Sequence, residues 1–182
     1  MGFSGFAANT APGKDDQLVI EQGGNTRYVT VSALTEAINL RVSLSGVSDD
    51  GTQTLTNNTW TQIEWRTEAL DDFYTTDLSL APGLALRVDE TTAGYWLVYS
   101  SLEFAYSSAN TTPRRVRILK NGTDLLSGIY QRATSASVVT DLAGQAIVKL
   151  EPHDYITVEG NQESGADLDI SNGFFYAHRM AL

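Results

Sequence analysis

The stretch GYWLVYSSLEFAY, residues 94–106, alternates along its length between large apolar residues and others. Successive side chains of a β-strand point to opposite faces, so this pattern predicts one long strand. Its even positions form a face suited to a protein core: Trp96, Val98, Leu102, Phe104 and Tyr106. Its odd positions are apolar at Tyr95, Leu97 and Tyr99 and then become polar. A strand that is apolar on both faces at one end is buried twice there, so the second face needs another subunit.

Short alternating segments surround this strand from Trp60 to the end of the chain. They include TWTQIEWRT (59–67), ALRVDE (85–90) and RRVRILK (114–120). An Asn121-Gly122 turn joins RRVRILK to TDLLSGIYQRA (123–133), which predicts a hairpin. The segments SASVVTDL, AIVKLEP, DYITVEG and FFYAHRMAL complete the series. About eight or nine strands at a spacing of about ten residues predict an all-β, antiparallel sandwich or barrel.

The N-terminal part has a different pattern. QLVIEQ (17–22) and RYVTV (27–31) flank a Gly-Gly-Asn-Thr turn, which predicts a hairpin. Ser32 is a helix N-cap candidate, and ALTEAINL (33–40) predicts a short helix after it. A two-stranded hairpin and a two-turn helix are marginal alone, so we expect this part to pack on a neighbour.

The chain therefore divides into three predicted parts. Residues 1–41 form an arm and an anchoring module. Residues 42–58 are rich in Ser, Thr, Gly and Asn, which indicates a linker. Residues 59–182 form the sandwich.

Composition and charge exclude several classes of function. The net charge of −10 argues against a nucleic-acid partner, which needs a basic face. The one basic cluster, Arg114, Arg115, Arg117 and Lys120, is either a solvated strand face with ion pairs or a surface for an acidic partner. The chain has no cysteine and hence no disulfide or thiolate zinc site. We expect no signal peptide and no membrane span, and synthesis in a reducing bacterial cytoplasm.

No cluster of residues predicts catalysis, a metal or a cofactor. His153 and His178 show no metal-ligand spacing, and we interpret them as a turn residue and an interface or rim residue. Asp167 and Asp169 with Glu163 are either a Ca²⁺ site or a solvated rim. We therefore expect a non-enzymatic protein.

Aromatic residues suggest one possible ligand. Phe73, Tyr74 and Tyr130 are candidates to line a carbohydrate groove, because tyrosine offers a flat apolar face with a polar edge. The alternative is that they make core or subunit contacts.

The segments GYWLVYSSLEF, KLEPHDYITVEG and NGFFYAHRMAL, in this order, resemble strands of the tumour-necrosis-factor and complement-globular-head superfamily. The resemblance covers about Trp60 to Leu182. It implies a jelly-roll protomer and a compact homotrimer, with Tyr99 near the threefold axis and Phe175 as a second interface candidate. With Tyr95 and Leu97 these are the expected trimer-interface residues.

Two charged residues depart from that family's pattern. Glu103 and Arg179 stand in strands that are often apolar in the family. We expect them to pair with each other or to lie at the solvent end of the trimer.

The segment DDQLVIEQGGNTRYVTVSALTEAI (15–38) is similar to the N-terminal module of many phage fibre proteins, which docks the fibre on the particle. The resemblance implies a capsid anchor made of Leu18, Ile20, Tyr28, Val29, Val31, Leu34 and Ile38. The major capsid protein or another virion protein would be its partner.

Together these patterns predict a structural protein of the virion surface, a trimeric capsid decoration protein or head fibre. No segment is long enough for a fibre shaft, which favours the head over the tail. The alternative is the receptor-binding tip of a tail fibre or baseplate, with a host-surface glycan as partner.

Overall fold

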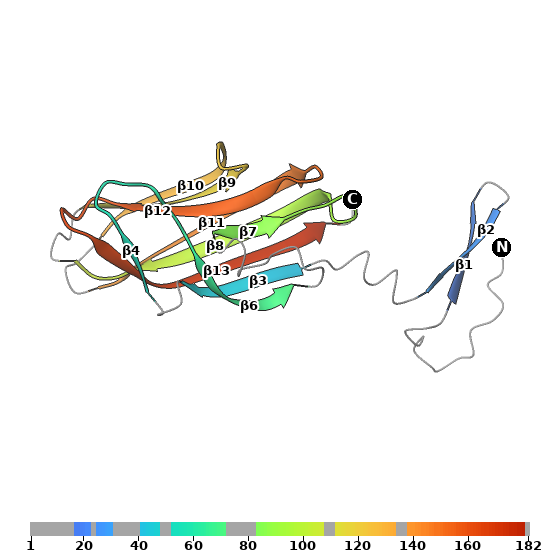
Figure 1. Ribbon diagram of the computed structural model, residues 1–182, viewed down its shortest axis with the longest axis horizontal. Helices are drawn as coiled ribbons and strands as arrows, with labels where there is room; N and C mark the ends of the chain where they lie inside the picture. Colours follow the sequence, from blue (N-terminus) through green and yellow to red (C-terminus); the bar gives the residue numbers. More distant parts are fainter. Residues whose placement is uncertain are drawn as a thin grey trace. The chain divides into compact units, whose positions relative to one another are not determined.

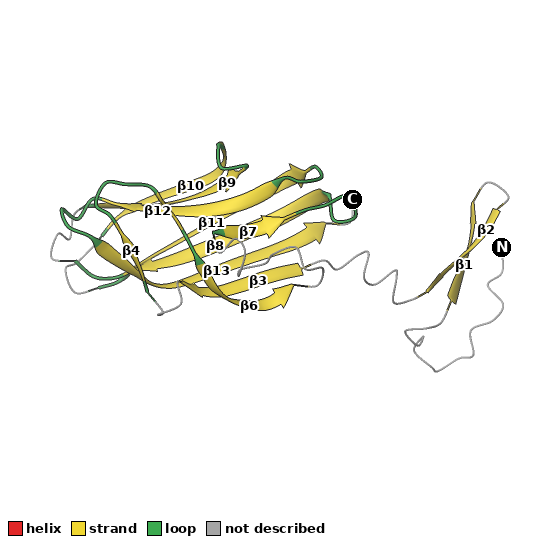
Figure 2. Ribbon diagram, in the orientation of Figure 1, coloured by secondary structure: helices red, strands yellow, loops and turns green. Residues whose placement is uncertain are grey.

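The computed structural model describes residues 17–22, 25–30, 41–47, 52–71, 83–107, 112–133 and 138–180. The chain divides into two compact units, Met1–Asn39 and Leu40–Leu182. The described residues contain strands and no helix, and all paired strands are antiparallel (Figure 2). The prediction of an all-β, antiparallel fold is confirmed.

The first unit contains the predicted hairpin. Strands β1 (Gln17–Gln22) and β2 (Asn25–Thr30) pair from Gln22 opposite Asn25 to Gln17 opposite Thr30. The anchor candidates Leu18, Ile20, Tyr28 and Val29 belong to these strands. The predicted helix and the candidates Val31, Leu34 and Ile38 lie outside the described residues.

The second unit consists of two sheets (Figure 1). In the described part, the larger sheet has the order β11-β8-β13-β3-β6, with β4 also paired to β13. Its strands are β11 (Thr140–Leu150), β8 (Gly94–Phe104), β13 (Leu168–Met180), β3 (Arg41–Val47), β6 (Trp65–Asp71) and β4 (Gln53–Leu55). The smaller sheet has the order β10-β9-β12-β5, with β7 also paired to β12. Its strands are β10 (Asp124–Arg132), β9 (Pro113–Lys120), β12 (Tyr155–Gln162), β5 (Thr61–Gln62) and β7 (Leu84–Arg87).

The core lies between the facing sides of the two sheets, where alternation along each strand buries every second side chain. The larger sheet contributes Trp96, Val98, Leu102, Phe104 and Phe175, and the smaller sheet contributes Val116, Ile118, Ile156 and Val158. This confirms the predicted core face of β8 except at Tyr106, which follows the strand and is 68% exposed.

Two strands lie in the segment that was expected to be a linker. Residues 42–58 contain most of β3, which pairs with both β13 and β6, and all of β4. That expectation is wrong for these strands, because a polar sequence can form a strand when apolar neighbours supply the burial.

The segment 59–67, predicted as one strand, is two strands in different sheets. β5 pairs with β12 in the smaller sheet and β6 with β3 in the larger one. The chain crosses between the sheets at Ile63 and Trp65, and both side chains are buried in the core. Conversely, SASVVTDL and AIVKLEP, predicted as separate strands, contribute to the single strand β11.

The predicted Asn-Gly hairpin is present between β9 and β10. Asn121 and Gly122 have positive φ angles of 53° and 70°, as a two-residue type I′ turn requires. The Asn121 side chain ties this turn to the next hairpin, because Nδ2 donates to Asp154 Oδ1 (2.8 Å) and Oδ1 accepts from the Tyr155 N–H (3.0 Å).

Asp154 is the charged centre of this contact. Besides Asn121, its carboxylate accepts from the Glu151 N–H (2.7 Å) and pairs with Lys120 Nζ (2.6 Å). Burial raises the pKa of Asp154, but the hydrogen bonds from Asn121, Lys120 and the Glu151 N–H outweigh burial and lower the pKa from 3.8 to about 2. The ionised form is therefore stabilised in the folded state.

We expect Asp154→Asn to lower the free energy of unfolding at pH 7 by about 1–2 kcal/mol. Because the folded pKa is lowered, the contribution is complete above the unfolded pKa and is lost as the pH falls through about 2. In urea unfolding, the difference between parent and variant should therefore shrink from pH 4 to pH 2. Asp124→Asn, at an exposed position, is the matched control. A difference that is constant down to pH 2 would contradict this account.

Candidate assembly and ligand surfaces

The outer face of the larger sheet carries a group of aromatic and aliphatic side chains. The register places Tyr99 opposite Tyr176 and Leu97 opposite Ile147. Directly opposed residues of antiparallel strands share one face of the sheet. We call this group the tyrosine face, made of Tyr95, Leu97, Tyr99, Ile147, Phe174 and Tyr176, all of them exposed or partly exposed in the protomer.

Contacts within the tyrosine face join β8 and β13. The rings of Tyr99 and Phe174 lie 6.3 Å apart, centroid to centroid, at an angle of 58°. Tyr176 OH lies 3.3 Å from His178 Nδ1, which places His178 on the same face. The face therefore presents a group of aromatic and aliphatic side chains, with Gln145 and Lys149 beside it, that stays at least partly exposed.

Phe175 is not on this face. It is 0% exposed and packs in the core against Trp65, with ring centroids 6.0 Å apart, whereas Phe174 is 37% exposed. A side chain that is wholly buried in the protomer cannot contact a second copy, so the prediction of Phe175 as an interface residue is wrong. The sequence analysis did not single out Phe174, Tyr176 and Ile147, which lie on the outer face. Residues 174 and 175 are both phenylalanine, so the local sequence does not distinguish the buried one from the exposed one.

The outer face of the larger sheet is polar at the end where β8 finishes. Glu103, Asp141 and Asn172 lie in one row across β11, β8 and β13 and line a shallow depression with Ser101 and Phe174. The carboxylate of Glu103 accepts a hydrogen bond from Ser171 Oγ.

Arg179 is separated from Glu103. Its guanidinium donates to the carbonyl oxygens of Thr91 (3.1 Å) and Ala93 (2.6 Å). The expected pair between Glu103 and Arg179 is therefore absent, since the register places them at opposite ends of β8.

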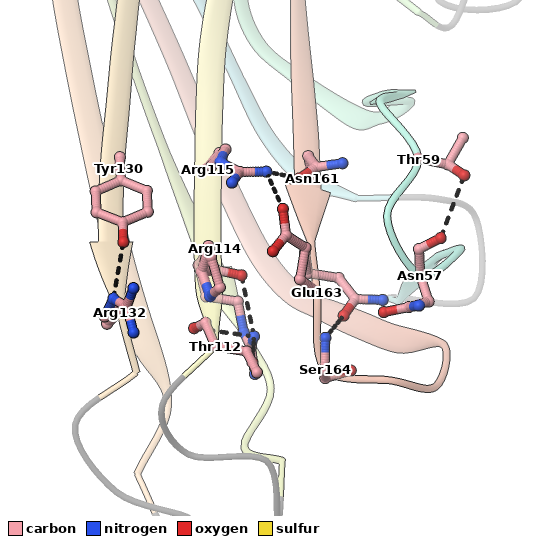
Figure 3. A network of polar contacts seen from close by, with 12 residues as sticks. Asn57, Thr59, Thr112, Arg114, Arg115, Tyr130, Arg132, Asn161, Glu163 and Ser164 are labelled. Carbon is pink, nitrogen blue, oxygen red and sulfur yellow. Dashed lines mark hydrogen bonds and ion pairs between the residues drawn. The ribbon is translucent and has the colours of Figure 1, made fainter.

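The outer face of the smaller sheet carries the predicted basic cluster in paired form. Arg115 Nη1 donates to Asn161 Oδ1 (2.9 Å) and to Glu163 Oε1 (2.5 Å), as Figure 3 shows. Arg117 binds Glu159 through Nε (2.7 Å) and Nη2 (2.5 Å). These pairs support the interpretation of a strand face with ion pairs. We call Arg115, Arg117, Glu159, Asn161 and Glu163 the charge-paired face.

Two exposed aromatic residues border the charge-paired face. The Arg117 guanidinium carbon lies 4.1 Å from the ring centroid of Trp60, and that of Arg115 lies 5.8 Å from the centroid of Tyr130. Arg132 Nε donates to Tyr130 OH (2.9 Å; Figure 3). Of the aromatic residues predicted to line a carbohydrate groove, Tyr130 is on this face, and Phe73 and Tyr74 lie outside the described residues.

Arg114 is the exception within the basic cluster, because its side chain points into the protein and is buried. Its Nη1 donates to Thr112 Oγ1 (2.8 Å) and to the Pro113 carbonyl (3.2 Å), whereas Nε and Nη2 have no hydrogen-bond partner among the described residues. Burial lowers the pKa of Arg114.

The candidate Ca²⁺ ligands engage separate partners. Asp169 accepts from Thr54 Oγ1 (2.6 Å), Asp167 accepts from the Asn57 N–H (3.3 Å), and Glu163 pairs with Arg115. Among the residues that the structure describes, no group of three or more histidine or acidic side chains is placed to hold a metal ion.

His153 lies in the turn before Asp154, with a φ of 73° and Nε2 3.5 Å from Glu90 Oε1.

Within the described ranges, no helix is long and apolar enough to span a membrane.

Comparison with known proteins identifies the fold. No family model and no curated protein matches the sequence. Among solved structures, the globular domain of the zebrafish complement 1qA protein is similar, with a TM-score of 0.53 and 11% identity over 78% of this chain and 98% of that one. Murine APRIL at pH 5.0 has a TM-score of 0.55 and 19% identity over 78% and 99% of the two chains. Eiger TNF from S. frugiperda has a TM-score of 0.50 and 14% identity over 79% and 94%. The second unit of this chain therefore has the jelly-roll fold of tumour-necrosis-factor and complement globular domains.

Proposed function

We propose that this chain is a non-enzymatic structural protein of a virion, a trimeric capsid decoration protein or head fibre whose first unit docks on the shell. The observation that carries the proposal is the uncovered tyrosine face on a jelly-roll unit. A contiguous apolar patch on a soluble protein marks an interaction surface. Its aromatic side chains are of the kind that is enriched at protein interfaces.

A second copy of the chain is the partner that the tyrosine face fits best. The chain carries a net charge of −10, so its remaining surface disfavours non-specific contact between copies, whereas this face is mainly apolar. Further exposed apolar residues, Leu125, Val138 and Val139, lie on the edge strand β10 and just before the edge strand β11. When one surface meets a different surface on the next copy, the contacts form a closed ring if the rotation between copies closes, and an open filament if it does not. The resemblance to the tumour-necrosis-factor superfamily favours a ring of three.

The first unit supplies the proposed attachment to the particle. It is a separate compact unit, and its sequence resembles the docking module of phage fibre proteins. Arg41, where β3 begins, lies opposite His178 near the end of β13. The chain therefore enters the jelly roll at the end where β13 finishes, whereas β9 begins and β12 ends at the opposite end. A trimer also matches a threefold site on a capsid without a symmetry mismatch.

Removing residues 1–39 tests the role of the first unit. We expect the remaining jelly roll to fold and to keep its oligomeric state, because its core and the tyrosine face belong to the second unit. It should no longer sediment with undecorated capsids, whereas the full chain should. Light scattering reports the oligomeric state, and co-sedimentation reports the attachment.

Two results would contradict the proposal. If the truncated protein still binds capsids, the first unit is not the anchor. If the full chain binds no capsid, the role in decoration is wrong even if the chain is a trimer.

The second candidate function is the receptor-binding tip of a tail fibre or baseplate. The observation that favours it is the pair of exposed aromatic residues, Trp60 and Tyr130, beside the charge-paired face. Sedimentation of the full chain with host cells but not with capsids would support this function over decoration.

A further inference from the structure

We propose that the charge-paired face, with Trp60 and Tyr130 at its borders, is a binding site for a neutral oligosaccharide. The inference adds a ligand to the proposed structural role. It does not depend on where on the virion the protein sits.

The two aromatic rings are placed to stack on sugar rings. Trp60 is 36% exposed and Tyr130 is 53% exposed, although each contacts a guanidinium that holds it in place. Tyr130 on β10 lies opposite Arg115 on β9, and Arg115 lies opposite Asn161 on β12. Trp60 directly precedes β5, whose Thr61 lies opposite Gly160 on β12. The two rings lie against neighbouring arginines of β9, Trp60 against Arg117 and Tyr130 against Arg115. Their exposed faces therefore border the same two ion pairs, where a short oligosaccharide could contact both rings.

The groups between the aromatics can bind hydroxyls. Arg115 makes both of its polar contacts through Nη1, and Arg117 contacts Glu159 through Nε and Nη2. In the part of the chain that the structure describes, Nε and Nη2 of Arg115 and Nη1 of Arg117 bind no other group and can donate to a ligand, and the Glu163 and Glu159 carboxylates have further acceptor capacity. Their positions are held by the ion pairs, so little side-chain entropy is lost when a ligand binds.

The charge balance selects a neutral ligand. Arg115 is neutralised by Glu163, and Arg117 by Glu159. An anionic or cationic ligand would have to compete with one of these pairs, whereas the hydroxyl groups of a neutral saccharide can use the remaining donors and acceptors. A protein partner would be expected to need a larger apolar centre than two separated rings provide.

The site remains accessible in the proposed assembly. It lies on the outer face of the smaller sheet, whereas the tyrosine face lies on the outer face of the larger sheet. The surface proposed to receive the tyrosine face is the apolar edge at β10 and β11, whereas Trp60 lies beside β5 at the other edge of the smaller sheet and stays uncovered.

Tryptophan fluorescence of the full chain tests the proposal directly. The chain has three tryptophans, and Trp65 and Trp96 are buried, so acrylamide should quench mainly Trp60. The probes are neutral oligosaccharides of hexoses and N-acetylhexosamines, screened on an array and then titrated. We expect at least one to bind and to protect Trp60 from acrylamide.

Three variants locate the site, with binding measured by calorimetry. Trp60→Ala and Tyr130→Ala should each weaken binding by about tenfold or more, because each removes one stacking surface. Tyr106→Ala removes an exposed tyrosine outside the site and should leave affinity unchanged. Because Trp60 lies just before β5 and Tyr130 lies in β10, misfolding of one variant still leaves the other as a test.

Any of three results would overturn the proposal. The array could retain no neutral oligosaccharide, or both site variants could bind as tightly as the parent. Binding to host cells could also persist unchanged after their surface glycans are removed, which would indicate a protein partner.

Discussion

Phe175→Ala should lower the free energy of unfolding by about 3–5 kcal/mol, as expected when a fully buried aromatic side chain is removed from a core. Phe175 is 0% exposed and packs between the sheets against Trp65, whose ring lies 6.0 Å away at an angle of 49°. The truncation would leave a cavity that the rigid strands on either side cannot fill. Urea unfolding followed by circular dichroism measures the loss, at several protein concentrations because association also stabilises the folded state.

The adjacent residue provides the matched control. Phe174→Ala removes the same group of atoms from the outer face, where the side chain is 37% exposed. We expect the protomer to lose less than about 1 kcal/mol, within the usual range for surface substitutions, while self-association becomes weaker. Equal losses of protomer stability for the two variants would show that the faces of β13 have been assigned incorrectly.

Tyr99→Asp should abolish self-association while leaving the jelly roll folded. Tyr99 lies in the middle of the tyrosine face, opposite Tyr176 and 6.3 Å from the Phe174 ring. A carboxylate at this position would be buried without a partner in the assembly, at a cost of several kcal/mol. In the free protomer it would remain solvated. Multi-angle light scattering should therefore report a monomer, with an unchanged circular dichroism spectrum.

The same substitution at a tyrosine outside the face distinguishes a local from a general effect of charge. Tyr106→Asp adds the same charge at a position that is 68% exposed. It should leave the oligomeric state as it is in the parent. A Tyr99→Asp protein with the oligomeric state of the parent would remove the tyrosine face from the interface.

Several features were predictable from the sequence because they depend on residues close together in the chain. The alternation in 94–106 places the inner side chains of β8 in the core, since the two faces of a strand follow directly from its period. Asn121-Gly122 forms its turn because both residues tolerate a positive φ. The hairpin of β1 and β2 likewise follows from two short strands around a Gly-rich turn.

Other features depended on contacts between distant segments. Neighbouring Phe174 and Phe175 are chemically identical, and only the pairing of β13 with β8 decides which of them is buried. β3 has a polar sequence and becomes a strand because β13 and β6 flank it. Arg115 pairs with Glu163, which lies 48 residues later in the chain.

The sequence by itself therefore determined the strand class, the long central strand and its core face, because local periodicity and turn chemistry specify them. Only the tertiary structure decided which sheet receives β5 and β6, which phenylalanine faces outward, and that Arg115 and Arg117 are neutralised beside Trp60 and Tyr130. The physical reason is that a shift of one residue in strand register exchanges the two faces of a strand, and register is set by long-range pairing.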